Sequence, residues 1–284
     1  MTNAAHVPDY LVIGHVTQDL VEDQRYVHGG TATYAALVAA RLGLKTGVLT
    51  SVGPGVTPFP ENSVYVQNCP SNASTVFENI YLGRARKQYV RSVARELTPS
   101  GLPSAWEDAS IVHLGPIAQE VSPDFVDSFG DALVGVTPQG WLRRWDEHGL
   151  VRPAEWLEGE RVLDRADVVI LSLEDLGGDR SRLERYIRRA RLLVLTVGER
   201  GAIVYRTSGH QRVRAFQACE VDPTGAGDVF AAGFLIRYAE TEDAIEAARF
   251  ANCVASFIVE GLGAENTPSR EQVEKRLATG GLRD

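Results

Sequence analysis

The stretch from Val221 to Phe234 constrains this chain most, because a glycine-rich loop runs there directly into an apolar segment, VDPTGAGDVFAAGF. Pro223 fixes φ and lacks an N–H donor, so it ends whatever structure precedes it. Small and apolar residues continue without interruption from Val229 to Leu235, which is typical of a buried helix. The sequence therefore predicts a loop whose free N–H groups lie at the positive end of a helix dipole, where anions bind.

Asp228 falls in the first turn of this predicted helix, and two interpretations fit it. It could act as a helix cap beside a tight turn. A cap needs only one polar residue, however, whereas Gly225 and Gly227 each cost roughly 0.5–1 kcal/mol of chain entropy. Two glycines around Ala226 indicate that a ligand approaches the backbone closely. We therefore favour a cradle for an oxyanion or phosphate with a carboxylate base inside it.

The segment DPTGAGD, followed by a helix of small residues, resembles the C-terminal signature of the ribokinase-like (PfkB-type) carbohydrate kinases. The resemblance implies that Asp228 is the catalytic base and that the amides of Gly225, Ala226 and Gly227 hold charge on the transferring phosphoryl group. It also implies ATP and Mg²⁺ as cofactors. We find neither a Walker A loop nor a G-x-G-x-x-G fingerprint in the sequence.

The remaining pattern predicts a single α/β domain. The chain has 284 residues, of which 44% are hydrophobic, enough for one large core. Short apolar runs such as 10–14, 111–116, 133–136 and 168–171 alternate with helical segments, among them 226–239 and 241–259. This alternation predicts a mostly parallel sheet covered by helices on both faces. The resemblance implies one ribokinase-like kinase domain over 1–284, a three-layer α/β/α core with a small β-lid.

The lid is expected where the pattern changes. Residues from Val64 to Val93 alternate without a helical repeat, which predicts antiparallel strands. By resemblance, the lid comprises about 15–28 and 63–97, covers the sugar and often pairs two subunits. The segment is basic, with Arg84, Arg86, Lys87, Arg91 and Arg95. Either these residues form a solvated face, or one arginine reaches the phosphates when the lid closes.

The acceptor site is expected near the end of the first strand. Asp19 follows that strand and could be a turn residue or could bind ligand hydroxyls, because ligands of α/β sheets bind beyond the strand ends. A double glycine opens the next helix, and the resemblance places it against the sugar. Tyr34 stands where this family often has Asn. Gln139 follows a later strand and either faces the pocket or packs in a loop. The candidate acceptor-binding residues are Asp19, Gly29, Gly30, Thr31, Tyr34 and Gln139.

The donor site is expected in the second half of the chain. The run from Thr196 to Gly201 resembles the Thr-x-Gly-x-x-Gly segment that lies along the nucleotide phosphates, although a plain hairpin turn also fits. Asn252 and Ser256 lie about one helical turn apart and so share a face, which in the family meets the adenine. The candidate nucleotide-binding residues are Thr196, Gly198, Gly201, Thr224, Asn252 and Ser256.

Two metal sites follow from the resemblance alone. Ser172-Leu-Glu174-Asp175 is loosely similar to the family's Asn-x-x-Glu motif, which orders Mg²⁺ through water, so Glu174 or Asp175 is expected near that ion. Asp222 and Thr224 match positions that bind a monovalent cation such as K⁺ in some relatives.

The resemblance implies an ATP-dependent kinase acting on a hydroxyl of a small sugar or polyol. The segments GHV with Asp19, GGTATYA and HLGPI are most similar to the myo-inositol kinases of the family. A kinase of nucleosides or furanose sugars is the alternative. A catalytically silent sensor of sugar or nucleotide is a further one, against which the intact Asp228 and its glycines argue.

Charge and cysteine content set the remaining expectations. The formal net charge is −8, whereas nucleic-acid binders usually carry an excess of basic residues. The three cysteines are far apart and form no C-x-x-C pair, which favours reduced thiols in a cytoplasmic protein. No apolar run reaches the length of a membrane span, and the first residues lack the regions of a signal peptide.

Overall fold

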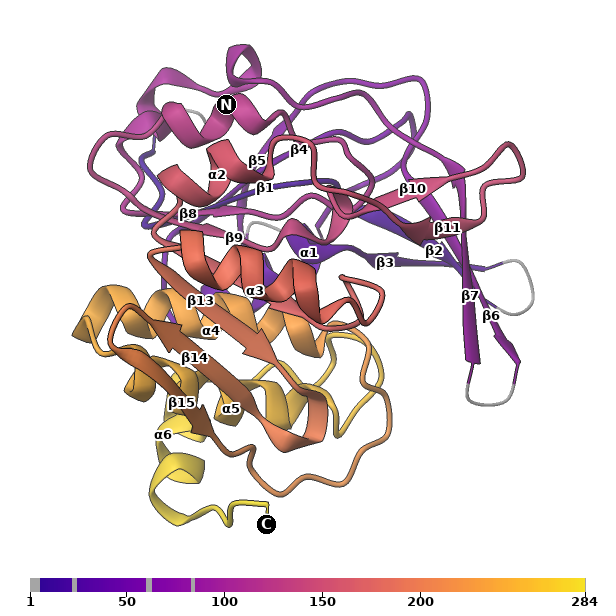
Figure 1. Cartoon of the computed structure of the whole chain (residues 1–284). Coiled ribbons are helices and arrows are strands. Elements are labelled where there is room, and N and C mark those ends of the chain that lie inside the picture. Colours follow the sequence, from indigo (N-terminus) through magenta and orange to yellow (C-terminus); the bar gives the residue numbers. More distant parts are fainter. Residues whose placement is uncertain (1–5, 22–24, 60–62, 83–84, 284) are drawn as a thin grey trace.

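A nine-stranded sheet runs through the computed structural model, which describes residues 6–21, 25–59, 63–82 and 85–283 (Figure 1). The strand order is β15-β14-β13-β12-β9-β8-β1-β4-β5. In chain order the strands are β1 (Tyr10–Ile13), β4 (Thr46–Thr50), β5 (Tyr65–Asn68), β8 (Ile111–Leu114), β9 (Leu133–Val136), β12 (Val168–Ser172), β13 (Leu192–Thr196), β14 (Ala202–Arg206) and β15 (Gly209–Val213). All neighbouring strands from β5 to β13 pair in parallel, and β14 and β15 add antiparallel at one edge.

The central strands are apolar on both sides, as expected for a parallel sheet covered on both faces. In β1, Tyr10 and Val12 join one hydrophobic cluster, and Leu11 and Ile13 join the other. The period-2 geometry of a strand sends successive side chains to opposite faces. The predicted fold class is therefore confirmed.

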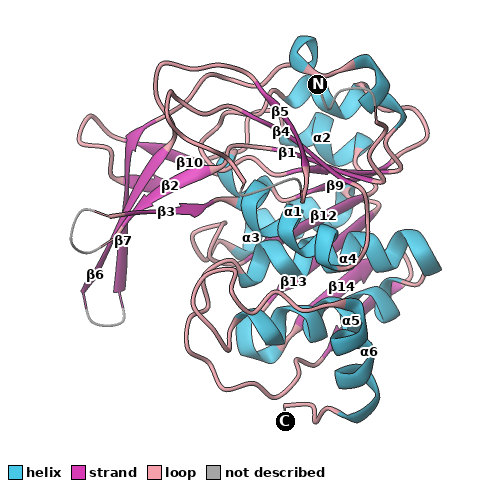
Figure 2. Cartoon of the chain, turned by 180° about the vertical axis from the view of Figure 1, so that it is seen from behind, coloured by secondary structure: helices cyan, strands magenta, loops and turns pink. Residues whose placement is uncertain are grey.

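Helices form the two outer layers (Figure 2). One layer contains α1 (Thr31–Arg41), α4 (Ala226–Thr241), α5 (Ala244–Ile258) and α6 (Arg270–Thr279). The other contains α2 (Gly159–Arg165), α3 (Arg180–Arg189) and turns of 3₁₀ helix. Those turns are η3 (Pro99–Gly101), η4 (Ser104–Asp108), η5 (Pro123–Asp127), η6 (Pro138–Gly140) and η7 (Gly198–Arg200). Two layers of helix around one sheet make the three-layer core.

The predicted helix over 241–259 begins three residues late. Glu242 adopts a left-handed conformation with φ of 55° and ends α4. The side chain of Asp243 then accepts hydrogen bonds from the backbone N–H groups of Ile245 and Glu246, which starts α5. An Asp that accepts from the second and third N–H of a helix is a strong N-cap, and it sets the boundary.

A second, four-stranded sheet stands beside the core where the lid was expected, and we refer to it as the lid (Figure 1). Its order is β3 (Tyr26–Gly29), β2 (Thr17–Leu20), β6 (Val76–Leu82) and β7 (Ala85–Ser92). The pair β2–β6 is parallel and the other two pairs are antiparallel. The expected lid boundary of 63–97 is wrong at its start, because β5 pairs with β4 at the edge of the core sheet. The hairpin of β10 (Arg143–Trp145) and β11 (Val151–Pro153), which we did not predict, packs next to β7.

The base of the lid is held by a buried histidine. His15 bonds through Nδ1 to the Thr75 hydroxyl at 2.7 Å and through Nε2 to the carbonyl of Arg95 at 2.8 Å. The buried Glu120 carboxylate accepts the N–H of His15 at 3.1 Å and that of Ile117 at 2.9 Å. Burial lowers the pKa of His15. A neutral imidazole therefore joins the segments that enter and leave the lid.

Among the basic residues of the lid segment, Arg91 is already engaged in contacts within the protein. Arg91 Nε donates to Glu78 at 2.6 Å, and its guanidinium lies 4.6 Å from the centroid of the Tyr89 ring. Lys87 is exposed. These contacts favour a solvated face over a phosphate contact for Arg91. Arg84 and the side chain of Arg86 lie outside the described residues.

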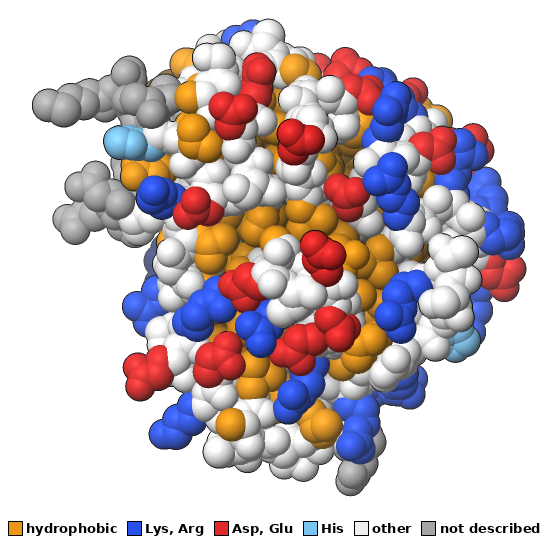
Figure 3. All heavy atoms as spheres, turned by 90° about the vertical axis from the view of Figure 1, so that its left-hand side faces the viewer, with side chains coloured by type: hydrophobic (Ala, Val, Ile, Leu, Met, Phe, Trp, Pro, Cys, Tyr) orange, Lys and Arg blue, Asp and Glu red, His pale blue; other side chains and the backbone are white. Residues whose placement is uncertain are grey.

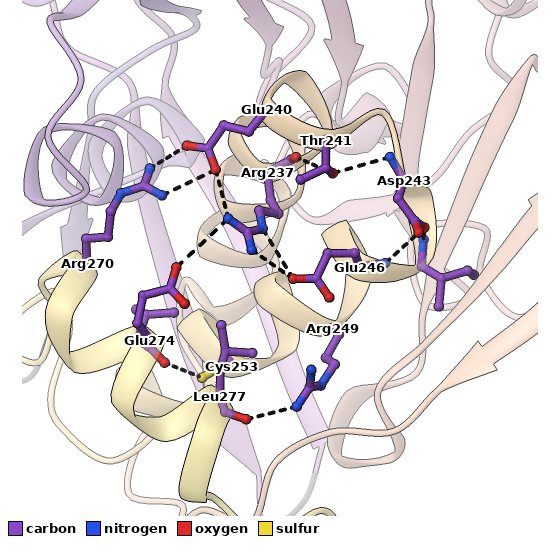
Figure 4. Close-up of polar contacts among 12 residues, drawn as sticks. Arg237, Glu240, Thr241, Asp243, Glu246, Arg249, Cys253, Arg270, Glu274 and Leu277 are labelled. Atoms are coloured by element: carbon purple, nitrogen blue, oxygen red, sulfur yellow. Dashed lines mark hydrogen bonds and ion pairs between the residues drawn. The ribbon is translucent and has the colours of Figure 1, made fainter.

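Charged side chains join the helices of one outer layer (Figure 4). From α4, Arg237 donates to Glu246 of α5 at 2.9 Å and to Glu240 at 3.2 Å. Arg270 of α6 donates to Glu240 at 2.6 Å. The Arg237 guanidinium also lies 5.3 Å from the centroid of the Phe250 ring. These contacts fix α4, whose first turn carries the predicted base.

The face turned away from the lid shows basic and acidic side chains side by side, with apolar surface between them (Figure 3). Across the described residues, every helix is too short or too polar to cross a membrane.

Candidate active site

The predicted base lies where expected, in the first turn of α4. Gly225 precedes this helix in a left-handed conformation with φ of 78°, which a side chain rarely adopts. Gly227 does not have a positive φ, and a Cβ there would meet no atom within 4 Å. Gly225 is therefore needed for its backbone conformation, whereas Gly227 leaves open space above the helix end, as expected where a ligand approaches the backbone.

Asp228 is partly buried and hydrogen-bonded. The Thr31 hydroxyl donates to its Oδ1 at 2.6 Å. Burial raises the pKa of Asp228 to about 6, the Thr31 bond lowers it, Asp175 and Asp19 raise it, and Arg143 lowers it. A carboxyl group with a pKa near neutral suits general-base catalysis, because it is ionised at working pH and still holds a proton well.

The double glycine brings the start of α1 against the lid strand β2. A Cβ on Gly29 would lie 2.6 Å from Oδ2 of Asp19, and one on Gly30 would lie 2.6 Å from the carbonyl oxygen of His15. Gly30 also has a φ of 84°. Only glycine permits this approach. Asp19, predicted to bind hydroxyl groups, thus lies beside the helix start that carries Thr31.

Tyr34 lies on the next turn of α1, buried against the glycine loop. Burial raises the pKa of Tyr34 well above its usual value, and the charges of Asp19, Asp228 and Asp222 act in the same direction. All three carboxylates are therefore near the phenol, which places Tyr34 between the acceptor side and the loop of Gly225.

Gln139 contacts another carboxylate in the site. Its Nε2 donates to Asp175 Oδ1 at 3.1 Å, and Ser172 donates to Asp175 Oδ2 through both its N–H and its hydroxyl at 2.8 Å. Trp141, two residues further along this loop, packs in the core, stacked on Trp156. The structure thus assigns Gln139 to the site and Trp141 to packing.

Arg143 is a site residue that we did not predict. It lies at the start of β10 and lines a cavity of about 200 Å³ with Gln88 of the lid, Glu174 and Asp175. It is also the cation whose charge acts on Asp228. The signal in the sequence was an arginine four residues after Gln139, in a loop that follows a strand end.

A donor-side cavity of about 330 Å³ opens on the other side of the glycine loop. Thr196, Gly198, Gly201, Gly227, Asn252 and Ser256 are among its lining residues, so most of the predicted nucleotide-binding set comes together. Thr224 does not line it. A wider groove of about 590 Å³ beside α3 shares Ser172 and Thr196 with this cavity.

Backbone contacts fix the walls of the donor-side cavity. Asn252 Nδ2 donates to the carbonyls of Val213 and Arg214 at 3.2 Å. Gly201 has a φ of 88°, and a Cβ there would collide with the carbonyl of Val213. The run from Thr196 to Gly201 therefore forms a tight turn between β13 and β14, and the same residues form a wall of the cavity.

The expected Mg²⁺ site and the expected monovalent-cation site lie in different surroundings. Glu174 lines both the donor-side cavity and the cavity of Arg143. Mg²⁺ usually takes one or two carboxylates and completes its shell with water and substrate phosphates, which fits that place. Asp222 accepts from the N–H of Thr224 at 2.9 Å, which holds the loop. The described residues contain no group of three or more His, Cys, Asp or Glu side chains able to hold a metal by themselves.

An ionisable base at a glycine loop, between an acceptor side under a lid and a donor-side cavity, defines a group-transfer enzyme of the three-layer α/β type. Residues 166–271 match the model of the pfkB family carbohydrate kinases. The chain carries a PfkB family carbohydrate kinase domain and is an enzyme of this ATP-dependent phosphotransferase class.

Relatives agree with this assignment. A nucleoside kinase of Methanothermobacter thermautotrophicus is 27% identical over 92% of this chain and 88% of its own. An inositol 3-kinase of Arabidopsis thaliana is 26% identical over 89% and 74%. Among solved structures, a pyrophosphate-dependent kinase of the ribokinase family has a TM-score of 0.79 at 24% identity, covering 94% and 99% of the two chains. The nucleoside kinase of Methanocaldococcus jannaschii has a TM-score of 0.73 at 20% identity, covering 95% and 98%.

Proposed function

We propose that this protein transfers a phosphoryl group from ATP to a hydroxyl of a small polyol, with myo-inositol as the first candidate. The observation that carries the proposal is the place of Asp228, with Asp19 on the acceptor side and the donor-side cavity beyond Gly227. The segments around Asp19, Gly29 and His113 resemble the inositol kinases of the family. A ribokinase-family structure that matches this fold contains a pyrophosphate analogue and myo-inositol.

The chemistry asks the protein for positioning and charge stabilisation. Asp19 binds hydroxyl groups of the acceptor. Asp228 takes the proton of the attacking hydroxyl, and the amides of the loop from Gly225 stabilise the oxygens of the transferring group. Glu174 would hold Mg²⁺, which when bound would supply positive charge to the ATP phosphates.

The bulk of the Tyr34 side chain favours a small acceptor. Its ring fills the space beside Gly225, where the family's usual Asn would leave more room. A nucleoside carries a base as well as a furanose and needs that room. The choice of a single-ring polyol rests on this bulk.

A nucleoside is the second candidate, favoured by the names of the curated relatives. Besides the nucleoside kinase above, a cytidine kinase of Thermococcus kodakarensis is 28% identical over 81% of this chain and 88% of its own. For these relatives the acceptor is a nucleoside.

A phosphorylation assay over polyols, pentoses, hexoses and nucleosides tests the acceptor, with ATP and pyrophosphate each offered as donor. We expect turnover of myo-inositol with ATP and slower hydrogen exchange in the lid when myo-inositol is added. Phosphorylation of adenosine or ribose but not of myo-inositol would refute the choice of acceptor and leave the kinase intact. If no acceptor is phosphorylated and ATP does not bind, the sensor interpretation replaces the kinase.

Asp228→Asn tests the base. We expect kcat to fall by about 10²–10⁴-fold while ATP still binds, because Asn keeps the size and loses the basicity. Asp164→Asn is the matched control, since Asp164 forms an exposed ion pair with Arg189. Near-normal kcat in Asp228→Asn would show that another group removes the proton.

The cofactor and assembly proposals have simple tests. Activity should vanish in EDTA and return with Mg²⁺, and replacing K⁺ by a bulky organic cation tests the loop of Asp222. Sedimentation velocity tests pairing of two subunits through the lid.

A further inference from the structure

Two helix starts from distant parts of the chain meet at one hydrogen bond. Thr31 is the first residue of α1, and Asp228 lies in the first turn of α4. These helices pack against each other. The Thr31 hydroxyl donates to Oδ1 of Asp228 at 2.6 Å, across 197 positions of sequence. That distance is short for a hydroxyl and suits a charge-assisted bond to a carboxylate.

The Thr31 side chain is fixed by a second contact. Thr31 is 1% exposed, and its methyl group lies over Gly115 at the end of β8, where a Cβ would come 2.5 Å from Cγ2. The same notch is bounded by Thr137, whose hydroxyl bonds to Nε2 of the buried His113 at 2.9 Å. With its methyl group seated in this notch, the hydroxyl can point only along the remaining direction, toward the carboxylate.

The charged groups around Asp228 indicate what the hydrogen bond from Thr31 does. Around Asp228, the acidic groups are Asp175 after β12 and Asp19 on β2, and the cation is Arg143 on β10. The phenols of Tyr10 and Tyr34 also face it, and both stay neutral. Two nearby carboxylates and burial oppose ionisation, so a donor aimed at one oxygen stabilises the charged form that a base needs.

We propose that Thr31 is a positioning residue for the general base: it holds Oδ1 of Asp228 and leaves Oδ2 to receive the proton of the acceptor. The inference rests on the proposed role of Asp228. It assigns to Thr31 a different task from the acceptor contact that the sequence led us to expect. Loss of a side chain that orients the base should change the pKa of that base. Loss of an acceptor contact should instead change the KM for the acceptor.

The pH dependence of kcat/KM separates the two roles, because its acid limb reports the pKa of the base in the free enzyme. Thr31→Val keeps the shape and removes the donor. Loss of a hydrogen bond to a charged group should move the acid limb to higher pH by about one unit. It should also lower kcat several-fold at high pH, where the base is fully ionised but no longer oriented. Thr31→Ser keeps the hydroxyl and should leave the limb unchanged.

Thr46→Val is the matched control. Thr46 is equally buried, its hydroxyl bonds to the carbonyl of Leu44, and it lies at the opposite end of the sheet. We expect a normal pH profile from it. Should Thr31→Val fail to fold, Thr31→Ala removes the same hydroxyl without adding bulk and carries the same expectation.

The outcomes distinguish this inference from the proposed function. An unchanged acid limb in Thr31→Val or Thr31→Ala, with a raised KM for the acceptor, overturns the positioning role and restores the acceptor contact. If Asp228→Asn is inactive at the same time, the base assignment still stands. If Asp228→Asn is active, the base assignment and this inference fall together.

Discussion

The ring of Tyr34 lies directly against Gly225, so that a Cβ on this glycine would come 2.5 Å from Cε1 of the ring. The helix that begins the acceptor side and the loop that begins the donor side are therefore in contact at a position where only glycine fits. Substitutions on either side of this contact should have different effects.

Gly225→Ala should destabilise the protein and Gly227→Ala should not. At Gly225, alanine meets both a positive φ and the Tyr34 ring, which costs about 1–3 kcal/mol or more. At Gly227, alanine has space and gains helix propensity of about 0.5–1 kcal/mol. Urea unfolding measures both. We expect Gly227→Ala to lose activity nevertheless, because Gly227 lines the donor-side cavity. Equal stabilities for the two variants would contradict this account of the loop.

Tyr34→Asn should change the choice of acceptor. Removing the ring opens the space beside Gly225, so kcat/KM for nucleosides should rise relative to myo-inositol. The ratio should change by about tenfold for each 1.4 kcal/mol by which nucleoside binding strengthens. The measurement is competition between adenosine and myo-inositol. An unchanged ratio would mean that Tyr34 does not select the acceptor.

The charge of Asp228 should cost stability. Its pKa in the fold is about 6, above the value of about 3.9 in an unfolded chain. Folding therefore favours the protonated form, and this contribution is fully present below about pH 4 and is lost as the pH rises through 6. Asp228→Asn should accordingly unfold at higher urea than the wild type at pH 7, by on the order of 2–3 kcal/mol. The advantage should disappear at pH 4. A variant that is less stable at pH 7 would refute the raised pKa.

Arg237→Ala should weaken the fold without altering catalysis. The side chain joins Glu240 and Glu246 and lies over Phe250, so its loss should cost about 1–2 kcal/mol (Figure 4). The exposed Arg189→Ala is the comparison, with an expected cost below about 1 kcal/mol. Thermal unfolding and kcat measure the two effects, and a large fall in kcat for Arg237→Ala would show coupling of this network to the site.

Arg283→Ala should raise KM for ATP more than KM for the acceptor. Arg283 lines the donor-side cavity, donates to Glu199 at 2.6 Å and bonds to the carbonyl of Ala218 at 2.9 Å. It thereby ties the C-terminal segment to two walls of the cavity. Arg161→Ala, an exposed ion pair elsewhere, is the control. An effect on the acceptor alone would contradict this placement of the donor.

The sequence predicted elements whose signals are local. The buried strands β1, β8, β9 and β12 and the helix α4 have apolar runs and clear end signals, and all were predicted. The strand β5 lies in the predicted strand region but was assigned to the lid, because it is partly polar and follows the same alternating pattern. The strand β15 was missed because four of its five residues are exposed. The helices α2 and α6 carry little apolar periodicity, and tertiary contacts complete them.

The same distinction applies to the site. The DPTGAGD loop could be recognised from the sequence alone, because its functional groups lie on consecutive residues. The bond from Thr31 to Asp228 and the position of Arg143 depend on how the sheet brings distant segments together, and no local pattern encodes that. Gln139 was a candidate from its place after a strand, but its partner Asp175 could be found only in three dimensions.

The two substrates are served by separate lengths of the chain. Asp19, Tyr34 and Arg143 lie within residues 10–143, whereas the donor-side cavity is lined entirely by residues from Ser172 to Arg283. The family model matches within that second part, at 166–271. The two parts can therefore vary separately, provided that Thr31 still reaches Asp228 and that Tyr34 still packs against Gly225. A chimera that takes residues 10–143 from a relative should inherit the acceptor of that relative and keep its own donor.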